Sequence, residues 1–316
     1  MGFGDFSFIC AKAPLPVCSV VRAAGVNATD TVYKGILPSC YARPVNLANT
    51  MVFEIGNAFV NIAALVIMLI ILFQVKSKYT AIGRSEMVFF FSVFIGLIVS
   101  TLIVDCGVSP PGSGSYGYFV AIQLGMVTAS CWSLAYSGMT GYQLWEDGTR
   151  FSMKVLRISS LGAFVMSFLV AIFTFENWSS GVDTEHTMGL FVVCYIVNGI
   201  LVVTYLVSQA VLSVFYLNNW WAFGALCLGG FFFVCSQLLV YAFSTKICEN
   251  VNHYIDGLLF GSLCNLSTVM MVYKYWDMIT TEDLEFAVTV GGDTGMGWGN
   301  YTDKDESLNL LNDSNN

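Results

Sequence analysis

The sequence contains few charged residues. Asp, Glu, Lys and Arg together make up 11% of its 316 residues, whereas hydrophobic residues make up 56%. An ordinary soluble domain contains about 25% charged residues. Because the apolar residues also stand in long unbroken runs, this composition excludes a soluble helical bundle and a β-sandwich.

The sequence also lacks the motifs that carry common catalytic chemistry. It contains two histidines, His186 and His253, without the spacing of metal ligands, and it has no Walker loop, HExxH or GxSxG motif. His253 and Asp256 are one helical turn apart, and a cap at the start of a helix explains this pair better than catalysis does. We therefore expect a protein that is not an enzyme, with no catalytic residues, cofactor, metal ion or nucleic-acid partner.

Proline is absent from the long apolar runs, because all six prolines lie outside them. Receptors and many transporters use proline kinks to change state, so this absence favours a comparatively rigid helical body. The sequence LWEDG at 144–148 replaces the acid-Arg-aromatic triplet of seven-helix receptors, and no internal repeat of the transporter type is visible. A seven-helix receptor or small-molecule transporter is therefore the alternative function.

Long apolar runs are the main feature that the sequence does contain. A helix needs about 20 apolar residues to cross a bilayer, and in lipid a helix satisfies its own backbone groups. The sequence therefore predicts an all-α, polytopic membrane protein with seven transmembrane helices. The seven runs are 50–75, 87–104, 118–144, 158–175, 188–217, 220–243 and 257–273.

Positive charges predict the orientation of these helices, because Lys and Arg in short loops resist translocation. The basic residues beside the ends of the first and third runs are Lys76, Lys78, Arg84, Arg150, Lys154 and Arg157. The loops on the other side, at 105–117, 176–187 and 244–256, contribute only Lys246. We therefore expect a lumenal N-terminus and a cytosolic C-terminus.

This orientation divides the chain into three parts: a lumenal tail at 1–49, a transmembrane domain at 50–276 and an acidic, disordered cytosolic tail at 277–316. The cytosolic tail has nine acidic residues against the single base Lys304. Within it, Asp283 and Glu285 form an acid-any-acid pattern that vesicle coat machinery can read as an export signal. The same pattern also arises by chance in acidic tails.

The cysteines and one glycosylation sequon fit the lumenal side. The cysteines expected there, where disulfides form, are Cys10, Cys18, Cys40, Cys106 and Cys248. They allow two disulfides and one remaining thiol, and the sequence does not fix the pairing. A link between the N-terminal tail and loop 105–117 through Cys106 is one alternative, and reduced, packed thiols are another. The sequon at Asn27 lies far enough from the bilayer for glycosylation.

Polar residues open the first apolar run. Glu54, Asn57 and Asn61 are spaced by three and four residues, which places them on one helix face. A carboxylate at membrane depth is costly and marks a candidate functional site. An interhelical hydrogen-bond face and a path for an ion or substrate are the two alternatives, and the first is favoured.

The last apolar run carries a strip of small residues. Gly257, Gly261 and Asn265 follow one another at four-residue steps, so another helix can approach them closely. The neighbour is either another helix of this chain or a client membrane protein. Internal packing is favoured.

Several uncommon blocks together point to a family. The blocks are PLPVCSV at 14–20, CYAR at 40–43, KYTAIGRSE at 78–86, DCGVSPPGSGSY at 105–116, LWEDGT at 144–149, VYAFST at 240–245 and MMVYKYWD at 270–277. With these blocks the chain resembles the fungal chitin synthase export chaperones from about residue 5 to residue 290. The resemblance does not extend to the tail after residue 290.

The resemblance implies a multi-pass protein of the endoplasmic reticulum membrane that helps a chitin synthase fold and reach the cell surface, in support of cell-wall chitin synthesis. It implies no catalytic residues. The implied partners are the synthase, the lipid bilayer and the vesicle coat machinery. Loops 105–117 and 76–86 are the first candidates for client contact, because contact with bulk lipid would not demand such particular sequences.

Overall fold

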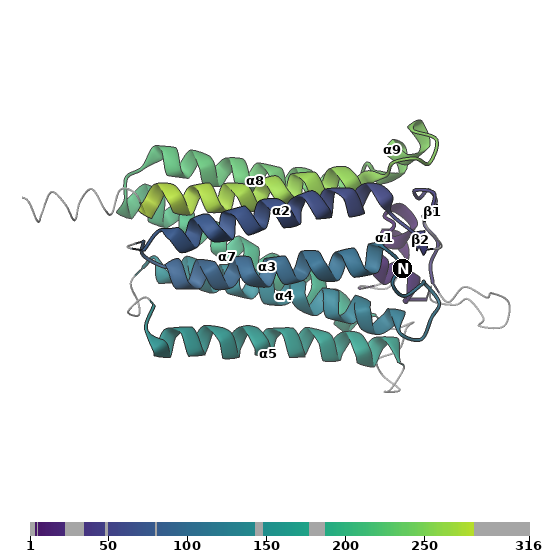
Figure 1. Cartoon of the computed structure of the whole chain (residues 1–316), viewed down its shortest axis with the longest axis horizontal. Helices are drawn as coiled ribbons and strands as arrows, with labels where there is room; N and C mark the ends of the chain where they lie inside the picture. The colour runs from purple at the N-terminus through teal and green to yellow at the C-terminus, as the bar shows by residue number, and fades with distance from the viewer. Residues whose placement is uncertain are drawn as a thin grey trace, which may run out of the picture.

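The computed structural model describes residues 4, 6–22, 35–47, 50–79, 81–142, 148–176 and 187–280. Long helices lie side by side along one axis and form a bundle (Figure 1). The expected sites at Asn27, Asp283 and Glu285 lie outside the described residues.

Six helices in the described part of the chain are long and apolar enough to cross a membrane. Their bounds are Ile55–Ser77 (α2), Arg84–Asp105 (α3), Tyr116–Thr140 (α4), Arg150–Phe175 (α5), Met188–Tyr216 and Trp220–Tyr241 (α8). The segment Met188–Tyr216 consists of α6 (Met188–Phe191), a π-helical stretch (Val192–Val197), α7 (Asn198–Val211) and a second π-helical stretch (Leu212–Tyr216). Residues 257–280 form a further helix that runs to the last described residue.

Short elements gather at one end of the bundle, which we call the hairpin end (Figure 1). They are α1 (Ser7–Lys12), β1 (Val45–Leu47), β2 (Thr50–Val52) and α9 (Ser244–Asn250), together with a 3₁₀ turn (Pro16–Ser19). The strands β1 and β2 pair antiparallel, with Val45 opposite Val52. The opposite end of the bundle, where α2 ends and α3 begins, carries Lys78 and is called the basic end below.

The described chain is helical, as expected, apart from the β1–β2 hairpin. The first long helix begins at Ile55 and not at residue 50, because residues 50–52 pair with β1. The backbone N–H of Phe53 then donates to the carbonyl oxygen of Asp105 at 3.1 Å. These bonds satisfy the backbone outside a helix, so the apolar side chains before Ile55 do not extend it.

The helix α5 begins at Arg150, eight residues before the expected start at residue 158. The Thr149 hydroxyl accepts a hydrogen bond from the Ser152 N–H at 3.3 Å and caps the helix. Lys154 and Arg157 therefore lie on the first turns of α5 and not in a loop. Long basic side chains on a terminal turn can reach polar headgroups while their stems stay in apolar surroundings.

The buried hydrophobic side chains of the described residues form two clusters. One joins α2, α3, α8 and the helix 257–280, and it includes Met68, Phe91 and Tyr275. The other lies at the hairpin end, where Phe6 and Cys18 from the N-terminal segment pack among residues of α4, α5 and α6. The described N-terminal residues are therefore packed against the end of the bundle.

Large apolar side chains remain exposed along the outside of the bundle. Phe73 on α2 is 74% exposed, Ile158 on α5 is 70% exposed and Phe231 on α8 is 59% exposed. Soluble monomers rarely expose extensive apolar patches. These outer faces are suited to contact with lipid.

Candidate functional site

The polar face of α2 is directed at the end of α3. Asn57 and Asn61 are buried, and both amide groups donate to Oδ2 of Asp105, at 2.8 Å and 3.3 Å. The spacing of four residues on α2 brings both donors to one acceptor. This face therefore fastens α2 to α3 through a buried carboxyl group that the sequence interpretation did not identify as its partner.

Glu54 and Asp256 bring two more carboxyl groups to the hairpin end. Oε2 of Glu54 and Oδ2 of Asp256 are buried and have no hydrogen-bond partner among the described residues. Burial is the main cause that raises the pKa of Glu54 well above its usual value, and the nearby carboxyl groups of Asp256 and Asp105 add to it. Burial also raises the pKa of Asp256, while backbone hydrogen bonds from Leu258 and Leu259 oppose this shift. Those bonds make Asp256 the cap of the helix 257–280.

The small-residue strip of the last helix packs against α8. A Cβ atom on Gly261 would lie 2.4 Å from Cγ2 of Val240, and one on Gly257 would lie 2.5 Å from the carbonyl oxygen of Leu239. The Ser236 hydroxyl donates to the carbonyl oxygen of Gly261 at 2.8 Å. The structure thus places an internal helix beside both glycines, whereas Asn265 faces the interior cavity.

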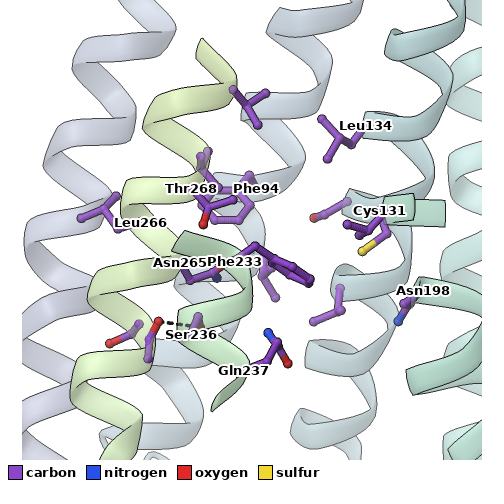
Figure 2. A pocket seen from close by; sticks show the side chains of 18 of the residues that line it. Phe94, Cys131, Leu134, Asn198, Phe233, Ser236, Gln237, Asn265, Leu266 and Thr268 are labelled. Carbon is purple, nitrogen blue, oxygen red and sulfur yellow. Dashed lines mark hydrogen bonds between the residues drawn. The ribbon is translucent and has the colours of Figure 1, made fainter. Parts of the chain in front are cut away.

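A cavity of about 590 Å³ lies inside the bundle. It is lined by α2, α3, α4, α7, α8 and the helix 257–280, and Figure 2 shows Asn198, Phe233 and Gln237 around it. Apolar side chains form most of its wall, and the described lining contains no charged residue. The amide side chains in the wall are Asn57, Asn61, Gln123, Asn198, Gln237 and Asn265.

Asn198 is one of two amides in the cavity wall whose buried oxygen has no hydrogen-bond partner among the described residues. Its Nδ2 donates to the carbonyl oxygen of Cys194 at 3.0 Å, but its buried Oδ1 has no hydrogen-bond partner in the described part of the chain. Oδ1 of Asn57 is also buried and also has no hydrogen-bond partner among the described residues. Both side chains are more than nine-tenths buried, at 7% and 6% exposure. Two residues of this neutral, mainly apolar wall therefore carry a buried acceptor atom without a partner among the described residues.

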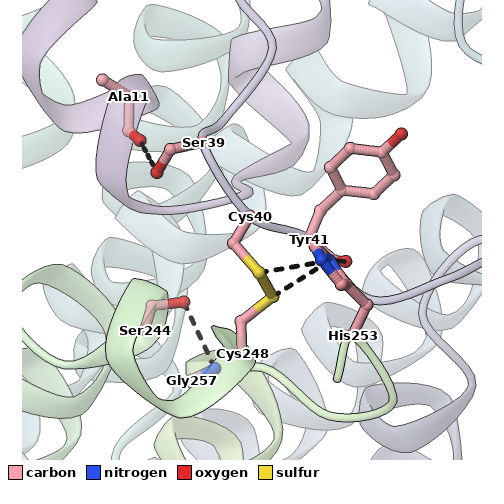
Figure 3. Close-up of a disulfide and its surroundings, with 8 residues drawn as sticks. All are labelled: Ala11, Ser39, Cys40, Tyr41, Ser244, Cys248, His253 and Gly257. Atoms are coloured by element: carbon pink, nitrogen blue, oxygen red, sulfur yellow. Dashed lines mark hydrogen bonds between the residues drawn. A yellow bond between two sulfur atoms is a disulfide. The ribbon is translucent and has the colours of Figure 1, made fainter. Parts of the chain in front are cut away.

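The structure contains two disulfides at the hairpin end. Cys10 is bonded to Cys18, and Cys40 is bonded to Cys248, whereas Cys106 is a free thiol. The N-terminal segment is therefore joined to α9 through Cys40 and not to loop 105–117 through Cys106. Figure 3 shows the imidazole of His253 beside the Cys40–Cys248 bond, with Nδ1 at 3.2 Å from the Cys40 sulfur.

At the basic end, the loop after α2 is attached to the last helix. Lys78 forms an ion pair with Asp277, and the indole Nε1 of Trp276 donates to the carbonyl oxygen of Ile82 at 3.1 Å. Burial lowers the pKa of Lys78, with a smaller contribution from Lys274. Blocks 78–86 and 270–277, far apart in the sequence, therefore meet at this end.

Block 144–149 joins the same end through its described residues. The side chain of Glu86 is fully buried, and its Oε1 accepts a hydrogen bond from the backbone N–H of Gly148 at 3.1 Å. Loops 76–86 and 105–117, both expected to contact a client, consequently lie at opposite ends of the bundle.

Sequence reasoning missed Asp105, Asn198 and Gln237 as site residues. Each is a polar residue within or directly beside an apolar run, and that is the signal that could have identified them. Which of them face one another depends on how the helices pack, and no local pattern contains that information.

Apolar helices of membrane-spanning length, packed side by side with apolar outer faces, define a multi-pass helical membrane protein. The family model described as chitin synthase export chaperone matches residues 2–290. The chain belongs to the chitin synthase export chaperone family, which is a family of chaperones and not of enzymes.

Curated relatives agree with this assignment. The chain is 57% identical over 288 residues to the chitin synthase export chaperone of Debaryomyces hansenii, an alignment that covers 91% of this chain and 93% of the relative. It is 54% identical over 288 residues to that of Candida albicans, with 91% and 92% covered. It is 51% identical over 306 residues to that of Saccharomyces cerevisiae, with 93% and 97% covered. No solved structure matches the chain significantly.

Proposed function

We propose that this protein is a chaperone of the endoplasmic reticulum membrane that enables a chitin synthase to leave for the cell surface. The single observation that carries this proposal is the match to the chitin synthase export chaperone family over residues 2–290. The client is a membrane protein, and the chaperone binds it without catalysing a reaction. The outer apolar faces of α2, α5 and α8 allow such contact within the bilayer.

The proposed topology has seven spans, with the helix 257–280 as the seventh, a lumenal N-terminus and a cytosolic C-terminus. The positions of the disulfides and of the basic residues support this topology. The disulfides Cys10–Cys18 and Cys40–Cys248 lie at the hairpin end, and disulfides form in the lumen. Lys78, Arg84 and the first turns of α5 lie at the basic end, which suits the cytosol. Glycan mapping at Asn27 tests it: Asn27→Gln abolishes a mobility shift if the N-terminus is lumenal, and a glycan-free wild-type chain counts against it.

We further propose that loop 76–86 at the basic end contacts the client. Tyr79 is 83% exposed, with the guanidinium of Arg84 5.4 Å from the centre of its ring. Lys78 and the Ile82 carbonyl hold the loop against the last helix, so this exposed aromatic residue stands on a fixed support. Aromatic residues on such supports often dominate binding energy. Vesicle coat machinery is the proposed partner of Asp283 and Glu285 in the tail.

Deletion of the gene in a strain with a fluorescently tagged chitin synthase tests the main proposal. We expect the synthase to stay in the endoplasmic reticulum and cell-wall chitin to fall, and re-expression of the wild-type chain to restore both. Normal delivery of the synthase to the cell surface in the deletion strain would refute the proposal.

The contact at Tyr79 has a test of its own with a matched control. Tyr79→Ala is expected to reduce the amount of synthase that copurifies with the chaperone at least fivefold. Tyr254→Ala removes a tyrosine of similar exposure, 69%, at the hairpin end and is expected to change copurification little. Equal losses in both variants, or no loss in either, would place the contact elsewhere.

A further inference from the structure

The interior cavity has a polar half and an apolar half. Because consecutive long helices run in opposite directions, residues in the first half of α2, of α4 and of the span Met188–Tyr216 lie level with residues in the second half of α3 and α8. The wall residues Asn57, Gln123, Asn198 and Gln237 consequently lie toward the hairpin end. Toward the basic end the wall is mostly apolar, with Phe90, Phe94, Leu134, Leu226 and Val272.

The polar half carries unmatched hydrogen-bond acceptors. Asn57 and Asn198 line the cavity and are more than nine-tenths buried, and the Oδ1 atom of each has no partner among the residues that the structure describes. A buried amide oxygen without a partner is unfavourable. A molecule that complements this wall therefore carries a hydrogen-bond donor at one end and an apolar body along the rest.

The size of the cavity suits a small molecule. Its volume of about 590 Å³ falls within the range of roughly 300–1,000 Å³ that small-molecule sites occupy.

The charge of the wall excludes a phospholipid headgroup. Phosphate groups are held by Arg or Lys, or by several backbone N–H groups at a helix start. The described wall has no charged side chain, and its residues lie within helices whose backbone groups are already paired. The complementary ligand is consequently neutral.

Two glycines leave room for such a ligand. Gly199 and Gly230 line the cavity, and a Cβ atom built on either would have no atom within 4 Å. A Cβ atom added at these cavity-lining positions would therefore meet open space and displace no protein atom. The same α8 helix carries Gly224, which also has open space but does not line the cavity.

We propose that the cavity binds a neutral lipid of sterol size, with its single hydroxyl group at the amides of the hairpin-end half and its apolar body toward the basic end. The hydroxyl donates to an amide oxygen of Asn57 or Asn198. This lipid site is separate from the client contact at Tyr79, so its failure in a test leaves the proposed export function unaffected.

Photolabelling tests the site. The full-length chain in phospholipid vesicles is exposed to a diazirine-bearing sterol, and labelled peptides are identified by mass spectrometry. We expect labels on α7 and α8, competition by excess unlabelled sterol, and at least tenfold less labelling in Gly230→Leu. Gly224→Leu on the same helix is the control and is expected to label like the wild-type chain.

Further probes and one further variant show which property of the ligand determines the labelling. A diazirine-bearing long-chain alcohol shares the hydroxyl and the apolar body, and we expect it to label the cavity peptides at least fivefold less than the sterol. Equal labelling by the alcohol, or by a phospholipid probe, refutes a sterol-sized site, and so does unchanged labelling in Gly230→Leu. Asn198→Leu, which keeps the size but removes the acceptor, is expected to lower labelling at least threefold, and unchanged labelling refutes the role of the amide.

A photo-crosslinker at Gln237 distinguishes a lipid from the client protein as the occupant of the cavity. Sterol captured at this position supports the proposal, whereas captured chitin synthase overturns it. Folding of each variant is checked by retention of the Cys40–Cys248 disulfide on non-reducing gels. If Gly230→Leu does not fold, Gly199→Leu in α7 replaces it with the same expected loss.

Discussion

Replacing Gly257 with Ala tests how the last helix is held against α8. A Cβ atom there would lie 2.5 Å from the carbonyl oxygen of Leu239 and 2.8 Å from Cα of Ser244. Both are backbone atoms, so no side-chain rotation relieves the contact and one segment must move. Overpacking of this kind costs about 1–3 kcal/mol. A loss of 1–2 kcal/mol lowers the ratio of folded to unfolded chain by a factor of about 5–30.

Gly162 in α5 provides the matched control. A Cβ atom on Gly162 would have no atom within 4 Å. Alanine is more favourable than glycine within a helix by about 0.5–1 kcal/mol, so Gly162→Ala is expected to stabilise the protein slightly. The same chemical change is therefore expected to have opposite signs at the two positions.

The assay is reversible unfolding of the purified full-length chain in mixed micelles with increasing sodium dodecyl sulfate, followed by far-ultraviolet circular dichroism. We expect the midpoint to move to lower detergent fraction for Gly257→Ala and to stay or rise for Gly162→Ala. An unchanged midpoint for Gly257→Ala would refute the close approach of the two helices. A similar fall for both variants would show that the effect is not one of packing.

Three further predictions concern the two ends of the bundle. Cys40→Ser is expected to lower stability more than Cys10→Ser in thermal unfolding, because their bridges close 208 and 8 residues, worth about 5 and about 2.5 kcal/mol of loop entropy. The pKa of Glu54 is raised above 4.5 in the folded protein, so ionisation of Glu54 lowers the stability of the wild-type chain as the pH rises from about 4.5. The melting temperature of Glu54→Gln should therefore increase relative to that of the wild-type chain between pH 4.5 and pH 8, and a difference that stays constant with pH would contradict this. Trp276→Phe removes the hydrogen bond to the Ile82 carbonyl, worth about 0.5–1.5 kcal/mol, and should speed limited proteolysis at loop 78–83.

The sequence was sufficient for the helical membrane architecture because apolar runs of spanning length are a direct consequence of lipid as solvent. The family could also be identified, since its blocks are uncommon. The boundaries of the helices were harder to predict from the sequence. Residues 50–52 are apolar enough to extend a helix, but they pair with β1, and Arg150 is too polar for a span although its backbone continues α5.

The contacts of the site were beyond sequence reasoning for a different reason. Asn57 and Asn61 could be placed on one face, but their partner Asp105 comes from another helix, and nothing local specifies which helices are neighbours. The same holds for the pairing of Cys40 with Cys248. The cavity is a property of six helices at once, so no single run predicts it.

The bridge between Cys40 and Cys248 has a consequence for biosynthesis. One sulfur is translated near the start of the chain, and the other only after α8 has been made. With both on the lumenal side, as proposed here, oxidoreductases in that compartment cannot close this bond on a ribosome-bound fragment that stops short of residue 248. The presence of the bond on a gel therefore reports that nearly the whole polypeptide has been synthesised and inserted.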